Sequence, residues 1–320
     1  TPFGPAAGPH TQMAQNIISA YLVGGRFFEL KTVQKLDDLK IDKPCIDAQD
    51  EGYNVEWSQE LSLDESYSEY VKAWFLIHLL KNILELSQSE RGFVFNMSVG
   101  YDLDGIKTER MDRFIEELKD ATKNKLFALY KSQLINQLRN KFTIQLLEEN
   151  FSINQDKIED IILKIKNISP QISSSVTLST MHGCPPQEIE AIAKYLIQEK
   201  NLHTYVKLNP TLLGYDFVHN TLHKLGYKYI SLDKSSFDHV LQYKDAIPMI
   251  NRLRAFAAAN NRVFGIKLSN TLGVKNTIKA LPGNDMYMSG RSIFPLTINL
   301  ANKLATEFNG EINIYYSGGA

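Results

Sequence analysis

The sequence predicts an α/β fold with parallel strands, of the TIM (β/α)8 barrel type. Runs rich in β-branched and aromatic residues alternate with helical patterns along the 320 residues, and this alternation is typical of βα units. Polar residues follow several of the strand-like runs, as they do where barrel strands deliver side chains to one mouth. The 43% hydrophobic content allows a large buried core.

The first elements carry clear start and stop signals. The run "TQMAQNIISAYLVGG" predicts a helix that Thr11 caps and Gly24 ends, and residues 26–34 then predict a strand. Ser62 and Glu65 have the spacing of a capping box. The helix that starts there is expected to bury one face, made of Tyr67, Tyr70, Val71, Trp74 and Ile77.

Further strand-like runs follow at regular intervals. They cover residues 92–101, 175–180, 204–210, 227–233, 263–271 and 312–319. Counting the run at 227–233 as a strand gives an apparently complete barrel, whereas without it the final strand of the barrel is absent. From about 107 to 172 the pattern is helical and rich in Lys, Glu, Asn and Gln. We expect this insertion to form a solvated helical hairpin outside the barrel, with a partner-binding arm as the alternative.

Composition limits the function classes. Lysine and arginine number 35 against 36 acidic residues, so no charge excess points to nucleic acid. No apolar run reaches the roughly 20 residues that a membrane span needs. Two cysteines, Cys45 and Cys184, cannot form a disulfide framework or a clustered metal site. We therefore expect a cytoplasmic protein without a metal site, cut from a longer chain because its first residue is Thr1.

Polar side chains stand where the strand-like runs end. Because loops after barrel strands share one mouth, several such ends in succession predict a common site. Two lysines among them predict a bound anion or a polarised ring, since adjacent positive charges repel without an electron-rich group between them. The candidates are Lys31, Thr32, Asn96, Ser98, Thr180, Lys207, Asn209, Asn270 and Thr271.

Two glycine turns add a phosphate-binding signal. Gly290 lies in "YMSGRSIFPL", and Gly318 and Gly319 lie in the final "SGGA". Glycine-rich turns after barrel strands expose backbone N–H groups that can hold a phosphate.

These motifs resemble a known family. "TPFGPAAGPH", "ELKT", "VKLNP", "LSNTLG", "MSGRSIFPL" and "YSGGA" occur in the order and at about the spacing of the FMN-binding barrel of dihydroorotate and dihydropyrimidine dehydrogenases. "NMSVGYDLDGIK", "TLSTMHGCPP" and "ALPGNDMYMSGR" look like the selenate reductase iron–sulfur (large) subunit. The resemblance spans residues 1–320 and implies one FMN-binding barrel domain that lacks its last strand. Iron–sulfur clusters, FAD and NAD(P)H would belong to other parts of the full-length protein.

The resemblance also assigns cofactor contacts. Lys31 would stand near the polar edge of the flavin ring and stabilise its reduced, anionic form. Lys207 and Asn270 match a second lysine and an asparagine that face cofactor and substrate, although Lys267 carries the same local pattern as Lys207. Asn54 matches a substrate-loop asparagine, and Thr271 joins it as a substrate contact. The remaining cofactor positions are Ala6, Ala7, Thr32, Asn96, Thr177, Gly290, Gly318 and Gly319.

The catalytic base is the point where this sequence departs from the family. Thr180 stands where relatives carry a cysteine or serine base, and Cys184 follows four residues later. A threonine hydroxyl needs a neighbour to take its proton, so His182 could assist it, or Cys184 could act instead. In the alternative reading, Thr180 only bonds the cofactor and Cys184 packs beside the helix start.

The expected function is an FMN-dependent oxidoreductase domain that passes electrons from NAD(P)H to a small-molecule substrate. Its expected partners are the other domains or subunits of an electron-transfer complex. Two alternatives remain open. One is a Schiff-base lyase or aldolase with Lys31 as the nucleophile, and the other is a catalytically silent scaffold domain.

Overall fold

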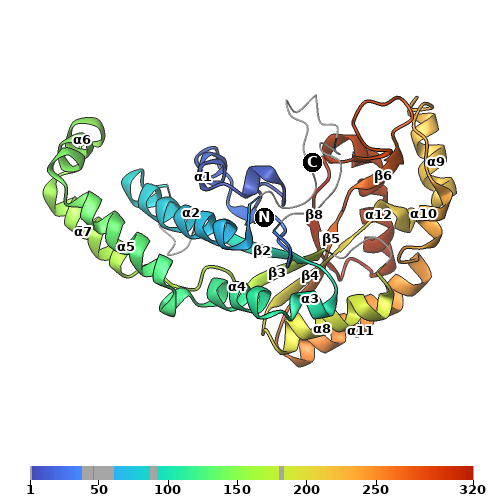
Figure 1. The fold of residues 1–320 in the computed structure, drawn as a ribbon, viewed down its shortest axis with the longest axis horizontal. Coiled ribbons are helices and arrows are strands. Elements are labelled where there is room, and N and C mark those ends of the chain that lie inside the picture. Colours follow the sequence, from blue (N-terminus) through green and yellow to red (C-terminus); the bar gives the residue numbers. More distant parts are fainter. Residues whose placement is uncertain (1, 38–45, 47–60, 87–91, 180–183, 320) are drawn as a thin grey trace. The chain divides into compact units, whose positions relative to one another are not determined.

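The computed structural model describes residues 2–37, 46, 61–86, 92–179 and 184–319 (Figure 1). The chain forms two compact units. The first unit comprises Thr1–Lys31, Leu61–Met97 and Glu109–Ser174, and the second comprises Thr32–Glu60, Ser98–Thr108 and Ser175–Ala320. Strand β2 (Val94–Gly100) passes from the first unit into the second.

The first unit combines a short parallel ladder with helices. Strand β1 (Phe27–Glu29) pairs with the start of β2, so that Phe28 lies opposite Phe95 and Glu29 lies opposite Asn96. The helices of this unit are η1 (Pro9–Thr11), α1 (Ala14–Leu22), α2 (Leu63–Ile83), α4 (Glu109–Lys119), η3 (Ala121–Lys123), α5 (Lys125–Leu138), α6 (Lys141–Phe151) and α7 (Gln155–Lys166).

An aromatic cluster forms the centre of the first unit. The Trp74 ring meets those of Phe93 and Phe95 edge-on, with centroids 5.0 and 5.5 Å apart. Its indole N–H donates to the carbonyl of Ser169 at 3.1 Å, so the polar atom of this buried ring is satisfied. Phe28 reaches the same cluster from β1, at 5.7 Å from Phe95.

The predicted start of α2 is confirmed, whereas that of α1 is wrong. Ser62 caps α2, and its reciprocal bonds with Glu65 complete the capping box. Thr11 instead ends η1, where its hydroxyl donates to the Gly8 carbonyl at 3.0 Å. Because that hydroxyl is engaged by the preceding turn, α1 begins at Ala14 without a side-chain cap.

The second unit is built on four parallel strands that lie side by side in Figure 1. In spatial order they are β3 (Ser175–Ser179), β4 (His203–Leu208), β5 (Phe264–Leu268) and β8 (Asn313–Tyr316). Helix α8 (Pro186–Gln198) contacts β4, and helices α11 (Tyr243–Ala259) and α12 (Phe294–Glu307) contact β5. The helices of the unit are α3 (Leu103–Ile106), α8 (Pro186–Gln198), η4 (Pro210–Leu213), α9 (Tyr215–Lys224), α10 (Lys234–Asp238), α11 (Tyr243–Ala259), η5 (Gly290–Ile293) and α12 (Phe294–Glu307).

An antiparallel hairpin that we did not predict follows β5. It pairs β6 (Leu272–Lys275) with β7 (Asp285–Met288). The Lys275 ammonium bridges Asp233 at 3.2 Å and Asp285 at 2.9 Å. The apolar side of the hairpin packs into a core shared with α9, α10 and α12, formed by Val218, Leu222, Phe237, Leu272, Val274, Met288, Ile293 and Leu296.

The strand predicted at 227–233 does not form. This segment is a turn in which only Ser231 makes a bridge, opposite Lys275. Gly226 enters it with a φ of +94°, and Tyr229 is 63% exposed. A buried parallel strand could not leave such a ring in solvent, so the alternating pattern here reflects turn geometry.

Within the described residues, no helix combines the length and the apolar character that crossing a membrane requires.

Candidate functional site

One face of the four-stranded sheet carries polar and aromatic side chains. Parallel pairing places Thr177 opposite Tyr205, and Lys207 opposite Lys267. Paired residues of parallel strands project to the same side, so these side chains share one face. The opposite face is apolar and buried, with Val176, Leu178, Val206, Leu208, Ile266 and Leu268 each at most 2% exposed.

Lys207 and Lys267 lie on the same face of the sheet. Lys207 and Lys267 carry the same local pattern, and their register shows that both face the polar side. Lys267 is 3% exposed and Lys207 is half-buried, and each is the penultimate residue of its strand. Two lysine side chains on one face suit an anionic or electron-rich ligand.

A tyrosine pair lies on the same face. The rings of Tyr205 and Tyr315 stack with centroids 3.6 Å apart and planes at 15°. Their packing requires Gly265, because a Cβ there would lie 2.5 Å from the Tyr205 ring. Burial raises the pKa of Tyr205, while its hydrogen bond to Tyr315 acts in the opposite direction. Tyr205 is therefore neutral at physiological pH.

Hydrogen bonds hold the loops that follow the strands. The backbone N–H of Asn270 donates to the Leu208 carbonyl at 2.8 Å. This bond joins the ends of β5 and β4. The Ser317 hydroxyl donates to the Leu268 carbonyl at 3.1 Å, which joins β8 to β5. Asn270 and Thr271 are both half-buried at this edge.

Buried polar atoms follow β4. Asn209 Oδ1 and Thr211 Oγ1 are inaccessible, and neither has a hydrogen-bond partner in the part of the chain that the structure describes. A buried polar atom without a partner is costly, so these atoms suit a polar ligand at this strand end. Sequence reasoning placed Asn209 at a strand end but missed Thr211, whose signal was its position directly after the "NP" of the same motif.

The two predicted phosphate turns contact each other. A Cβ on Gly319 would lie 2.5 Å from Arg291 Cα and 2.9 Å from the Gly290 carbonyl oxygen. Gly290, Gly318 and Gly319 have φ values of +59°, +104° and +86°, which other residues adopt only with strain. Glycine is thus required for the two turns to meet.

Arg291 is a residue that sequence reasoning missed at this junction. It follows Gly290 directly, its side chain is exposed, and its backbone touches Gly319. A guanidinium is well suited to bind phosphate. The pairing of "SGR" with a distant glycine turn could have signalled this role.

The first unit has a polar strand face of its own. Glu29 and Asn96 are paired across β1 and β2 and are 2% and 0% exposed. Lys31, two residues after Glu29, is 2% exposed. The Tyr70 hydroxyl donates to the Lys31 carbonyl at 3.1 Å and fixes the backbone there. Glu29 was not among the predicted residues, although its alternation with Lys31 could have indicated a second buried charged side chain on this strand.

Three further predicted cofactor contacts have partners inside the protein. The Ala7 amide donates to Glu29 Oε2 at 2.9 Å, and the Ala6 carbonyl accepts from the Thr11 hydroxyl at 3.5 Å. In the second unit, the hydroxyl oxygens of Thr32 and Ser98 lie 2.7 Å apart. The Ala7 N–H, the Ala6 carbonyl and the Thr32 hydroxyl thus support the local fold.

Cys184 is the one candidate for the catalytic base within the described residues, because Thr180 and His182 lie outside them, as does the predicted substrate contact Asn54. Burial raises the pKa of the Cys184 thiol to about 12, and the carboxylates of Glu188 and Asp102 act in the same direction. At neutral pH the thiol keeps its proton. It can donate a proton but is a poor acceptor.

The arrangement combines cations, aromatic rings and a glycine junction on one unit. No group of three or more His, Cys, Asp or Glu side chains able to hold a metal ion occurs among the residues with a described placement. The glycine turns are suited to an anionic group, and the face that carries the two lysines is suited to an electron-rich group.

The whole chain is similar in sequence to known oxidoreductases. A family model described as "Oxidoreductase YgfK, N-terminal TIM-barrel domain" matches residues 1–320. The proteins named "Putative oxidoreductase YgfK" from Escherichia coli K12 and O157:H7 are each 51% identical over 323 residues. Each match covers 100% of this chain and 30% of the relative. The chain thus spans less than a third of the length of these relatives.

Proposed function

This chain belongs to the family of YgfK-type N-terminal TIM-barrel oxidoreductase domains, and we propose that it binds FMN within a larger oxidoreductase. The family match supports the barrel fold over the whole chain. The 30% coverage of the relatives supports a multidomain protein, in which this chain supplies one redox site.

The contact between the two glycine turns carries the proposal. Gly319 approaches the backbone of Gly290 and Arg291 so closely that no side chain fits at position 319. Gly290, Gly318 and Gly319 all have positive φ. Such turns leave backbone N–H groups exposed to an anion. The FMN phosphate is proposed to bind to these N–H groups, and the Arg291 guanidinium would add a positive charge beside it.

The polar sheet face suits the flavin ring. When bound, FMN accepts two electrons from a donor and can release them singly. Lys207 and Lys267 would stabilise the negative charge that the reduced ring carries. Asn209 and Thr211 would supply hydrogen bonds to its polar edge, since their buried oxygens suit a polar ligand.

Lys31 and Asn96, in the first unit, are proposed as further cofactor contacts. In a TIM barrel, the residues that end the strands serve the active site. Lys31 follows the end of β1 by two residues, and Asn96 lies within β2 opposite Glu29; both side chains are buried. Asn54, Asn270 and Thr271 remain the proposed substrate contacts.

Proton transfer to the substrate is proposed to involve Cys184, with Thr180 and His182 as neighbours in the chain. A thiol with a raised pKa retains its proton at neutral pH and can deliver it to a reduced substrate. The other modules, with iron–sulfur clusters, FAD and NAD(P)H, are proposed to exchange electrons with the FMN.

The proposal is tested on the full-length protein. Its cofactors are released by denaturation and identified by mass, and FMN is expected in an amount equal to that of the chain. Borohydride treatment with a carbonyl substrate serves as the control for a Schiff-base enzyme. Absence of FMN together with a covalent adduct on Lys31 would contradict the proposal and favour a lyase.

A further inference from the structure

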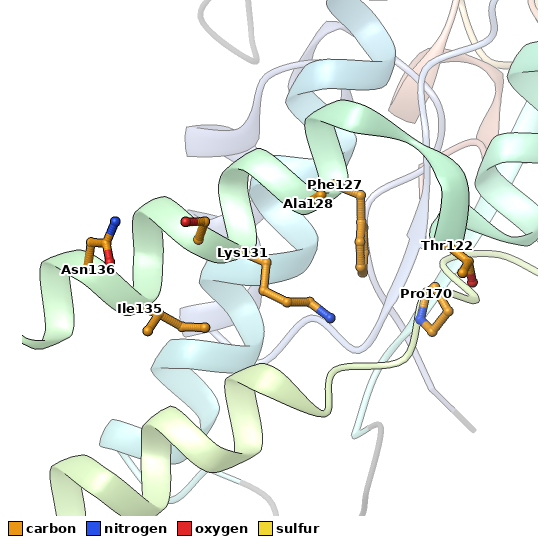
Figure 2. Close-up of a pocket in the computed structure, with 8 residues that line it drawn as sticks. Thr122, Phe127, Ala128, Lys131, Ile135, Asn136 and Pro170 are labelled. Atoms are coloured by element: carbon orange, nitrogen blue, oxygen red, sulfur yellow. The ribbon is translucent and has the colours of Figure 1, made fainter.

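A hollow lies on the helical part of the first unit, and none of its lining residues is among the candidates described above. Its volume is about 380 Å³, which is within the range of small-molecule sites. Figure 2 shows its walls, formed by one side of α5 together with η3 and the segment that follows α7. The lining residues are Thr122, Phe127, Ala128, Lys131, Ser132, Ile135, Asn136 and Pro170.

Lys131 is the only charged residue of this lining. In Figure 2 its side chain extends from α5 toward the side of the hollow that Phe127 and Pro170 form. Its ammonium lies 5.0 Å from the centre of the Phe127 ring and donates to the Lys166 carbonyl at 3.1 Å. That carbonyl belongs to the last residue of α7, where the helix dipole favours a positive charge.

The ammonium retains capacity for an anion. An ammonium has three N–H donors, and the Lys166 carbonyl takes one. Among the described residues, none places a carboxylate in ion-pair contact with Lys131. Partial burial lowers the pKa of this lysine, and no nearby charge opposes that effect.

The remainder of the lining is apolar or neutral. Phe127, Ile135 and Pro170 offer carbon surface, while Ser132 and Asn136 offer neutral hydrogen-bonding groups. The nearest carboxylate in sequence, Asp120, is already engaged, because it accepts the backbone N–H and the hydroxyl of Thr122 at 2.9 and 2.5 Å. A ligand here meets one cation, no lining carboxylate and a broad apolar wall.

We propose that this hollow binds a small amphipathic monocarboxylate. The carboxylate pairs with the Lys131 ammonium, and the apolar body lies against Phe127, Ile135 and Pro170. The neutral groups of Ser132 and Asn136 accommodate the second carboxylate oxygen or a bridging water. A dianion is disfavoured because the lining supplies a single positive charge.

The test uses the full-length protein and 3-phenylpropionate as the probe, measured by isothermal titration calorimetry. Saturable binding in about the millimolar range is expected for a ligand of this size. The neutral analogue 3-phenylpropanamide keeps the shape but lacks the charge, and we expect it to bind at least about tenfold more weakly. This comparison uses the unaltered protein and so does not depend on the folding of a variant.

Matched variants locate the site. Lys131→Met keeps the apolar stem and removes the charge, and it should weaken 3-phenylpropionate at least about tenfold. Lys125→Met is the control, since Lys125 is exposed on the same helix and is not part of the lining. Equal affinity for acid and amide, an unaffected Lys131→Met protein, or no saturable binding would each overturn the proposal.

Discussion

Lys207 and Lys267 occupy paired positions on the neighbouring strands β4 and β5 and project to the same face of the sheet. Like charges on neighbouring strands destabilise a sheet, so their common face has to be explained by what they bind or contact. The proposed flavin ring explains it, because both ammonium groups gain from negative charge on the reduced ring. This relationship could not be read from either strand alone.

Removing either charge should lower the reduction potential of bound FMN. In the full-length protein, Lys207→Met and Lys267→Met are each expected to shift it by about 30 mV or more, which is roughly a tenfold change for a two-electron couple. Spectroelectrochemical titration measures the shift. Lys228→Met is the control, because Lys228 is exposed in the turn after α9. Unchanged potentials in both variants would mean that these lysines do not act on the flavin.

Gly265 should tolerate no side chain. A Cβ there would lie 2.5 Å from the Tyr205 ring and 2.7 Å from the Asn313 carbonyl oxygen, which is backbone and cannot move aside. Gly265→Ala is expected to lower the free energy of unfolding by about 1–3 kcal/mol, measured by urea titration. The control is Gly273→Ala in β6, where the nearest ring atom is 3.6 Å away. Equal stability of the two variants would contradict the packing of the tyrosine stack.

Cys184 should react slowly with alkylating reagents at neutral pH. With a pKa of about 12 instead of 9.0, its thiolate fraction at pH 8 is on the order of one in ten thousand. The rate, followed by mass spectrometry of the Cys184 peptide, should rise about tenfold per pH unit until the pH approaches the pKa.

A carboxylate variant checks the cause of that slow reaction. Glu188→Gln removes a negative charge that raises the pKa of Cys184, so it should speed alkylation at pH 8. Glu199→Gln, at the exposed end of α8, should leave the rate unchanged. Alkylation of the parent protein as fast as that of a free cysteine would show that the thiol is not shielded.

The cap of α2 should contribute measurably to stability. Ser62→Ala removes the side chain that accepts the Glu65 amide and should lower the free energy of unfolding by about 1 kcal/mol. Ser19→Ala is the control, since the Ser19 hydroxyl donates to the Gln15 carbonyl within α1 and does not cap a helix. A loss no larger than that of the control would show that the capping box is dispensable.

Local signals explain what could be predicted from the sequence. The Ser62–Glu65 box and the buried face that includes Trp74 depend on residues close in the chain, and both were confirmed. The strands β3, β4, β5 and β8 were also predicted, because runs of β-branched and aromatic residues at these positions are bounded by turns.

Elements that depend on distant partners were not predicted. The β6–β7 hairpin is fixed by Lys275, whose carboxylate partners Asp233 and Asp285 lie on either side of it in the chain. The segment at 227–233 alternates like a strand, yet only Ser231 bridges a neighbour. Alternation alone cannot reveal that a partner strand is lacking.

The candidate site also combines features that the local sequence indicates with features that it does not. Lys207 and Gly290 were selected as candidates from their residue type and position in the chain. The contact between Gly319 and Arg291 and the common face of Lys207 and Lys267 depend on register and on turns far apart in the sequence. A single sequence does not contain that information in readable form.

The most direct test of FMN binding compares Gly319→Ala with Gly310→Ala in the full-length protein. Both glycines have positive φ, at +86° and +76°, so both variants carry a similar backbone strain of about 1–2 kcal/mol. Only at Gly319 does the added Cβ collide, at 2.5 Å from Arg291 Cα, while at Gly310 it meets nothing within 4 Å. FMN affinity, measured by flavin fluorescence on reconstitution, should fall at least about tenfold in Gly319→Ala and stay unchanged in Gly310→Ala. FMN affinity in Gly319→Ala equal to that of the parent would contradict a phosphate site at the glycine turns.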